Sequence, residues 1–448
     1  MEQLRHRIAD AISEGTLALG ARLPSWSDLA SQLGVARGTV RQAYSDLADA
    51  QLIVTAGAKG TRVSARPPGR RDNGVVSRRE QAGFPYFALE PLPLQIGVPS
   101  QAAFPAALWT RLGHRAMRET LNASVGYPDP CGEPGLRREI ACHLALARGL
   151  ACDPAQILIT SGYGAGLVLV LRALHLAGEK AWMEEPGYPV AREALRLAGI
   201  EPIPIHVDSQ GMNVELAIAK TPGARVAIVT PGQQAPLGVA LSRSRREALL
   251  AWAAEKEAWI IEDDYLAELQ ITGQAARALA AGDAARRTIY LGTFSKTVSP
   301  AIRLGFVVVP SALAETLSRT VALGMPAPSP FIQHAMMLFM QNGHYLRHLR
   351  RMKLLYRRGA EALRACIQAD VAETMSGLAL LVRLPPGADD RAICSAARQA
   401  GYGPSALSGW YADRTAAPPG LLLGVTNVDA TNAKEVWRNL ERLMGGLP

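Results

Sequence analysis

A lysine and an arginine seven residues apart are the side chains of this sequence best suited to covalent chemistry. Lys296 follows Ser295, and Arg303 lies further along the same segment. A lysine amine can condense with an aldehyde, and an arginine guanidinium can hold a phosphate through two parallel hydrogen bonds. Apolar, β-branched runs at 288–291 and 305–309 flank the segment and predict two buried strands. We therefore expect Lys296 on a connection between strands, where functional groups are commonly presented.

Other segments carry groups that could surround a phosphorylated, positively charged ring. The glycine-rich turn 160–166 follows one predicted strand and opens a helix, whose free backbone amides bind phosphate. The consecutive acids 262–264 follow the buried run 259–261, and acids at such a place need a compensating charge or hydrogen bonds. Tyr188, in the turn after the predicted strand 180–183, offers a ring for stacking.

The order of these segments predicts an α/β domain with a mainly parallel sheet and helices on both faces. From about residue 91 onward, strand-like runs alternate with helical stretches. A long helical section to Gln368, two strand-like runs and a closing helix then predict a smaller C-terminal α+β subdomain. The remaining predicted strands are 157–159, 180–183, 202–205 and 226–229 in the large part, about 126–311, and 378–384 and 421–425 in the small part, about 312–448.

In this order the segments resemble those of fold-type I proteins that bind pyridoxal 5′-phosphate (PLP), and of class I aminotransferases in particular. The resemblance implies that Lys296 forms a Schiff base with PLP, that Arg303 holds its phosphate, and that Asp263 pairs with its ring nitrogen. It also implies that Tyr188 stacks on the ring and that Tyr265 binds the ring oxygen, while Glu262 and Asp264 are structural. The further cofactor contacts that it implies are Ser161, Gly162, Tyr163, Gly164, Thr293 and Ser295.

The segment around Tyr127 resembles one whose tyrosine reaches the cofactor phosphate of the neighbouring subunit. Tyr127 is followed by Pro128, Asp129, Pro130 and, two residues on, Gly132. The resemblance implies an obligate homodimer with composite cofactor sites, and it leaves open whether the subunits are domain-swapped.

Departures from the aminotransferase pattern count against efficient transamination. Ala235 stands where aminotransferases carry the asparagine that binds the ring oxygen. The run 420–425 lacks the arginine that clamps a substrate carboxylate, and Arg383 and Arg414 are the nearest alternatives. The chain therefore keeps what binds PLP and has lost part of what processes a substrate, so we do not expect it to act as an efficient enzyme.

Residues 1–65 predict a winged helix-turn-helix, which is mostly α. Leu4, Ile8 and Ile12 have helical spacing, Pro24-Ser25 predicts a helix cap, and 36–50 predicts a third helix. The strands 52–54 and 61–63 enclose a short turn. A helical accessory domain that binds nothing has the same topology.

The motifs in this head resemble the GntR family of DNA-binding domains over its whole length. They are the Gly15-x-Leu17-x-x-Gly20-x-Arg22-Leu23-Pro24-Ser25 segment and the Leu29 to Leu47 segment. The resemblance implies that Arg37, Thr39 and Arg41 face double-stranded DNA and that Lys59 and Gly60 form the wing tip. Ser27 stands where the family usually has an arginine.

The overall composition permits DNA binding and gives no sign of a membrane or metal protein. Lysine and arginine exceed aspartate and glutamate by 48 − 39 = 9. The five cysteines form no CxxC pair, and no apolar run reaches membrane-spanning length. We expect a cytoplasmic protein with a Pro, Gly and Arg-rich linker at 66–90 and a PLP-binding effector domain at 91–448.

A GntR-like head and an aminotransferase-like body together resemble MocR-type transcriptional regulators. The resemblance implies a regulator of transcription controlled by PLP or a close B6 vitamer, acting on vitamin B6 synthesis or salvage genes. Two alternatives remain open at this point. The chain could be a regulator that senses an amino acid or amine, or a working aminotransferase with an appended head.

Overall fold

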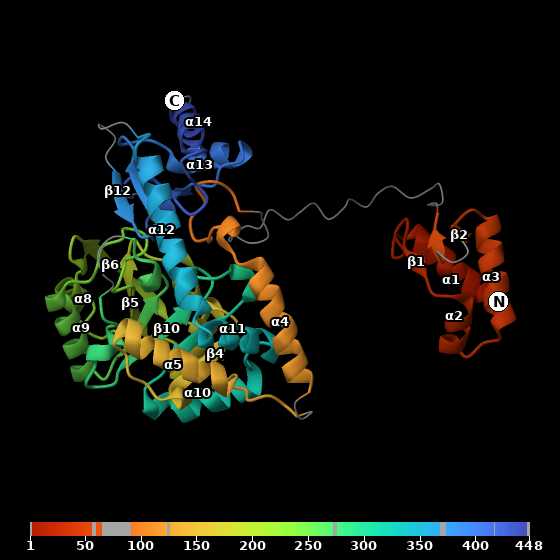
Figure 1. The fold of residues 1–448 in the computed structure, drawn as a ribbon, viewed down its shortest axis with the longest axis horizontal. Coiled ribbons are helices and arrows are strands. Elements are labelled where there is room, and N and C mark those ends of the chain that lie inside the picture. The colour runs from red at the N-terminus through yellow and green to blue at the C-terminus, as the bar shows by residue number, and fades with distance from the viewer. Residues whose placement is uncertain are drawn as a thin grey trace. The chain divides into compact units, whose positions relative to one another are not determined.

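The computed structural model describes residues 2–55, 60–64, 91–122, 126–271, 276–367, 373–415 and 417–445. They belong to two units, Met1–Leu89 and Glu90–Pro448 (Figure 1). The predicted linker 66–90 and Lys59 of the predicted wing tip lie outside the described residues.

The first unit has the predicted winged helix plan of three helices and a small antiparallel sheet. Ser25 caps the second helix as predicted, because its hydroxyl accepts a hydrogen bond from Asp28 N at 3.1 Å. Gly34 ends that helix at φ 65°, a left-handed conformation that glycine adopts readily. The elements are α1 (Glu2–Ser13), β1 (Arg22–Leu23), α2 (Trp26–Leu33), α3 (Arg37–Asp49), β2 (Ile53–Thr55) and β3 (Thr61–Val63); β1, which was not predicted, completes the sheet order β1-β3-β2.

The second unit is built on an eight-stranded sheet of mixed direction. Strands β10, β9, β8, β5 and β6 run parallel, as predicted for most of the sheet. Strand β11 runs antiparallel to both β10 and β4. In sheet order the strands are β4 (Ile157–Thr160), β11 (Gly305–Val308), β10 (Thr288–Thr293), β9 (Trp259–Asp264), β8 (Val226–Val229), β5 (Lys180–Glu185), β6 (Glu201–Asp208) and the unpredicted β7 (Gly211–Met212).

Helices cover both faces of this sheet because its strand side chains alternate between two apolar cores. In β10, Ile289 and Leu291 pack with α6, α7 and α10, whereas Tyr290 packs on the opposite face with α4, α5 and α11. Helices α8 and α9 cover that opposite face over β5, β6, β8 and β9. The bounds are α4 (Ala106–Leu121), α5 (Pro134–Arg148), α6 (Tyr163–Leu174), α7 (Pro189–Leu197), α8 (Val214–Lys220), α9 (Arg243–Glu255), α10 (Ser311–Gly324) and α11 (Pro330–Gln341).

The C-terminal part forms the predicted α+β subdomain around a four-stranded antiparallel sheet. Helix α12 (His344–Arg364) runs from the helices of the large sheet to this smaller sheet (Figure 1). Tyr356 of α12 accepts a hydrogen bond from Ser100 N at 2.9 Å. The strand order is β12 (Glu373–Ser376), β13 (Ala379–Arg383), β15 (Gly420–Gly424), β14 (Ser405–Ala406), of which β12 and β14 were not predicted; α13 (Asp390–Gln399), the 3-10 turn η7 (Leu407–Trp410) and α14 (Ala433–Gly445) complete the part.

Candidate functional site

Lys296 lies on the connection between β10 and β11, as its flanking apolar runs predicted. Its Nζ donates a hydrogen bond to Gly97 O at 2.6 Å. Gly97 has φ 75°, and a Cβ there would lie 2.9 Å from this Nζ, so the close approach requires glycine. Burial lowers the pKa of Lys296 from 10.5 to about 8, while the charge of Asp263 raises it. An amine that is less protonated at neutral pH is a better nucleophile toward an aldehyde.

Asp263 is a buried acid at the end of β9, paired in register with Leu291 of β10. Burial raises the pKa of Asp263 to about 7, and the nearby Tyr163 hydroxyl acts in the opposite direction. Neither Oδ1 of Asp263 nor the Tyr163 hydroxyl has a hydrogen-bond partner of normal length and angle among the described residues. A buried acceptor without a partner is costly, and a protonated pyridine nitrogen would supply both the donor and the positive charge. Asp263 therefore fits the ring of PLP.

The turn between β4 and α6 faces Arg303, which brings the predicted phosphate ligands together. Arg303 Nη2 donates a hydrogen bond to Ser161 O at 3.0 Å. Gly162 precedes α6 at φ 85°, and a Cβ there would lie 3.3 Å from the Arg303 guanidinium. The first amides of α6 have no partner within the helix, and its dipole favours an anion. These residues fit a phosphate group.

Gly164, Thr293 and Ser295, which were also predicted as cofactor contacts, lie in α6 and at the end of β10. Gly164 is in the first turn of α6. Thr293 ends β10, and its Oγ1 accepts a hydrogen bond from Ser295 N at 3.1 Å. Both Thr293 and Ser295 are half-buried, so their side chains remain accessible to a ligand.

The predicted ring contacts, Tyr188 and Tyr265, lie in one aromatic and apolar cluster. The Tyr188 ring centroid is 5.9 Å from that of Tyr163 and 5.8 Å from that of Trp410 in η7. Burial, with the charge of Asp263, raises the pKa of Tyr265 well above its ordinary value, so its hydroxyl stays protonated and can donate.

Leucines take the place of a substrate-binding guanidinium on this side of the site. Leu422 of β15 is buried in a cluster with Ala235 and Trp410, against which Tyr188 and Tyr265 pack. Arg383 and Arg414 are exposed. Arg192 is buried, but its Nη2 donates to Glu185 Oε2 at 3.1 Å and to Trp410 O at 2.7 Å. Neither Arg383 nor Arg414 is buried in this cluster, although the charge of Arg383 acts on Tyr411, which packs against it.

Tyr127 is not brought into the site within one chain. Its side chain is fully exposed, with a relative accessibility of 105%. Among the described residues it makes no hydrogen bond. Its predicted contact with a second subunit stays a prediction.

Buried polar residues that the sequence did not single out hold the strands around the site. Burial raises the pKa of Glu184 to about 7, and its carboxylate accepts hydrogen bonds from Thr230 and Gln234. Asp264, predicted to be structural, binds Arg148 Nε at 2.7 Å and the Tyr290 hydroxyl at 2.6 Å. A single acid or tyrosine in an apolar run carries no positional signal, so only the packing identifies these partners.

A second polar chain leads away from the lysine segment. Thr297, which follows Lys296, has its Oγ1 3.2 Å from the Tyr345 hydroxyl oxygen. Tyr345 donates to Glu268, which is also paired with His143. These contacts fix the lysine segment to α12 and α5, and nothing in the spacing of these residues predicted them.

In the head, the predicted DNA contacts lie at the beginning of α3. Arg37 and Arg41 are exposed and one helical turn apart, and Thr39 is half-buried between them. Gly60 has φ 83°, and a Cβ there would lie 3.0 Å from Arg22 Nε. This surface presents two cationic side chains at a helix N-terminus. Lys59 is outside the described residues.

Two further features of the described residues concern membrane-spanning helices and metal-binding groups. Within the described residues, no helix is long and apolar enough to cross a membrane. In the same residues, no group of three or more His, Cys, Asp or Glu side chains is placed to bind a metal ion.

The fold and the site define a winged-helix head joined to an aminotransferase-like domain of fold type I. Residues 1–63 match the model of bacterial regulatory proteins of the gntR family, and residues 93–400 match that of aminotransferase class I and II. The chain therefore belongs to the MocR-type transcriptional regulators, which confirms the resemblance read from its motifs.

Similar proteins include regulators and aminotransferases. The probable rhizopine catabolism regulatory protein MocR of Rhizobium meliloti is 32% identical, covering 97% of this chain and 91% of that protein. The pyridoxine biosynthesis transcriptional regulator PdxR of Corynebacterium glutamicum is 34% identical, covering 79% and 76%. The structure of Pyrococcus horikoshii kynurenine aminotransferase, solved with PMP, matches with a TM-score of 0.71 and 26% identity over 81% of this chain and 92% of that one.

Replacing Asp263 with asparagine is expected to stabilise the cofactor-free protein at pH 8. Burial raises the pKa of the Asp263 carboxyl in the folded protein from 3.8 to about 7. With respect to this carboxyl, the folded protein is therefore most stable below pH 3.8, where the carboxyl is protonated in both the folded and the unfolded state, and it loses stability as the pH rises to about 7. Asp263→Asn should flatten this pH dependence and raise stability at pH 8 by on the order of 2 kcal/mol. Thermal unfolding without and with PLP measures it. The variant should gain less from PLP than the wild type, and an equal gain would contradict the assignment.

The rate of PLP capture should follow the titration of Lys296. With a pKa of about 8 in place of 10.5, the uncharged amine becomes abundant between neutral pH and pH 9. Stopped-flow absorbance after mixing PLP with cofactor-free protein should therefore give a rate that rises with pH and levels off above about 8. Asp263→Asn should move this inflection to lower pH, because the Asp263 charge raises the pKa of the amine. An inflection at the ordinary lysine value would contradict the burial argument.

Proposed function

We propose that this chain is a transcriptional regulator that binds PLP through Lys296 and whose DNA binding is controlled by PLP or a close B6 vitamer. The observation that carries this proposal is the buried Oδ1 of Asp263, which has no hydrogen-bond partner of normal length and angle among the described residues and whose carboxylate acts on the Lys296 amine. A site built to bind a protonated ring and an aldehyde needs both groups, and a merely structural acid would have a partner.

When bound, PLP would supply an aldehyde and an electron-withdrawing ring. Lys296 would hold it covalently, and Asp263 would keep its ring nitrogen protonated. Arg303 and the turn at Ser161 and Gly162 would hold the phosphate by charge-assisted hydrogen bonds. The further residues that we propose as cofactor contacts are Tyr163, Gly164, Tyr188, Tyr265, Thr293 and Ser295.

We further propose that the regulator is a homodimer and that Tyr127 of each subunit completes the cofactor site of the other. A tyrosine with a relative accessibility of 105% has no packing role within its own chain. Two heads on one dimer would read a paired operator. We place this action in the cytoplasm, where the chain would meet its DNA.

The substrate side of the site supports a role in sensing rather than in efficient transamination. A substrate α-carboxylate needs a fixed guanidinium to orient its Cα–H bond. Leu422 and Ala235 instead form an apolar wall against Tyr265. Because the relative PdxR is named for pyridoxine biosynthesis, we propose vitamin B6 synthesis or salvage genes as the targets of this chain.

The test measures DNA binding as a function of PLP. Gel shifts on the upstream regions of vitamin B6 synthesis and salvage genes should change when PLP is added to the cofactor-free protein. A panel of amino acids and amines, added to the PLP-loaded protein, should change neither its absorption spectrum nor its DNA affinity. A saturable spectral change with one amino acid, coupled to altered DNA binding, would replace the proposal with an amino-acid sensor. Turnover of an amino acid with an oxo acid would replace it with an aminotransferase.

A further inference from the structure

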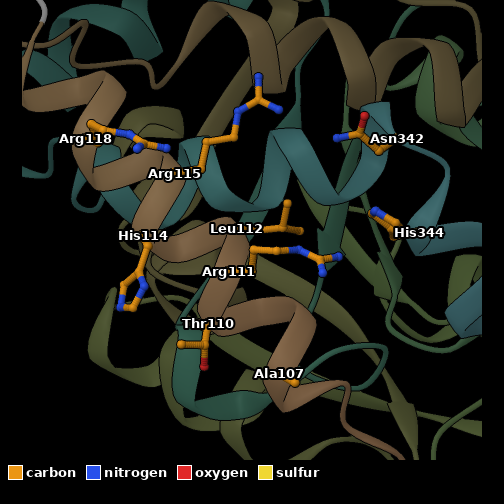
Figure 2. A pocket seen from close by; sticks show the side chains of 9 residues that line it. All are labelled: Ala107, Thr110, Arg111, Leu112, His114, Arg115, Arg118, Asn342 and His344. Carbon is orange, nitrogen blue, oxygen red and sulfur yellow. The ribbon is translucent and has the colours of Figure 1, made fainter.

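Outside both sites, the second unit has a basic groove between α4 and the turn that joins α11 to α12. Arg111, Arg115 and Arg118 of α4 line it together with Asn342 and His344 (Figure 2). The groove has a volume of about 690 Å³, and none of the described residues that line it is acidic. Figure 2 shows the Arg111 side chain reaching from α4 toward His344.

Two of the three α4 arginines carry charge that no acidic side chain of the described residues neutralises. The side chains of Arg111 and Arg118 are exposed and have no ion pair or hydrogen bond among the described residues. Arg115 differs, because its Nε is 2.6 Å from Oε1 of Glu119. Glu119 is also paired with His334 at 2.7 Å, so this acid is already shared. The groove is therefore net positive.

Helix α12 extends this positive surface from the far wall of the groove. Arg347 Nη2 donates hydrogen bonds to Asn342 O at 2.9 Å and to His344 Nδ1 at 2.7 Å. Burial lowers the pKa of His344, as do the charges of Arg347 and Arg111, so its ring is neutral at pH 7 and accepts. Arg350 and Arg351 are exposed one turn beyond Arg347.

We propose that this basic groove binds the phosphate backbone of double-stranded DNA, without regard to base sequence. The proposal deepens the proposed DNA-binding function of the chain, on which it rests. Arg111 and Arg118 are separated by about 10 Å along α4, and one strand of B-DNA presents about three phosphates over that length. Guanidinium groups that lack an internal partner can bind such phosphates and displace their counterions.

The test uses the full-length protein and a mixed-sequence duplex of about 60 base pairs, six helical turns. The variant is Arg111→Gln with Arg118→Gln, which spares the paired Arg115 and changes only exposed side chains. Fluorescence anisotropy gives the affinity between about 50 and 200 mM salt. The salt slope, which is the change in log affinity with log salt concentration, should be smaller by about 1.8 per subunit in the variant. The variant should therefore lose about tenfold less affinity than the wild type between about 50 and 200 mM salt. The control removes the same charge elsewhere, with Arg243→Gln and Arg319→Gln, whose side chains are 93% and 77% exposed.

A slope equal to that of the control variant would overturn the proposal. So would a change in molar mass of the groove variant by light scattering, because the groove would then be an interface between copies of the chain. A parallel measurement with Arg37→Ala and Arg41→Ala separates this proposal from the proposed function. If only the head variant loses affinity, the groove proposal alone fails. If only the groove variant loses affinity, the groove proposal is supported and the proposed role of the head in DNA binding is wrong.

Discussion

Replacing Lys296 with alanine is expected to abolish the absorption band of covalently bound PLP and the response of that band to borohydride. Lys296 is the half-buried lysine whose Nζ donates a hydrogen bond to Gly97 O and whose pKa is lowered by burial to about 8. Borohydride reduction of the wild type should add the phosphopyridoxyl mass to the peptide that contains Lys296, and spectroscopy with peptide mass analysis measures both effects. Loss of a buried, partly desolvated amine should leave the fold intact, so circular dichroism should not change.

The matched control is Lys180→Ala on β5 of the same sheet, where the lysine side chain is 51% exposed. This variant should keep the band and its reduction. Lys296→Ala should still bind PLP without a covalent bond, through Arg303 and the turn at Ser161, so that dialysis removes the cofactor. A reducible band that survives in Lys296→Ala would show that another amine holds PLP.

Replacing Arg37 and Arg41 together with alanine is expected to remove most of the sequence-specific DNA binding. Both side chains are exposed on one face of α3, in the first turns of the helix that enters the major groove in winged helix-turn-helix domains. Each arginine that reads a base contributes about 1–3 kcal/mol, so two such contacts contribute about 2–6 kcal/mol, which is a loss of affinity of about thirtyfold to about twenty thousandfold. Gel shifts on specific and mixed-sequence duplexes measure it.

The salt dependence of the same variant distinguishes the two kinds of contact. An arginine that binds phosphate should weaken binding to every duplex and reduce the salt slope by about 0.9. The control is Arg5→Ala with Arg7→Ala on α1, which removes equal charge from the same unit. Unchanged affinity of the α3 variant, or an equal loss in the α1 variant, would contradict the placement of the DNA surface on α3.

The local sequence by itself determined most elements of both units. Ile8 and Ile12 recur at helical spacing because one face of α1 must be buried, and both are buried. The runs that became β4, β8 and β9 are apolar because helices cover both faces of the sheet at these strands, and such strands have continuous apolar segments. Short edge strands such as β1 and β7 were not predicted, because a strand of two residues is too short to show an alternation of apolar and polar residues.

The ordered motifs likewise identified the family, since a lysine between two strands and acids at a strand end are encoded locally. Only the tertiary structure determined how these groups shift one another's pKa. Burial sets the pKa of Lys296 and Asp263, and burial depends on residues from several elements at once. The apolar wall at Leu422 and the basic groove on α4 also arise from segments distant in sequence, whose proximity is fixed by packing and by no local pattern.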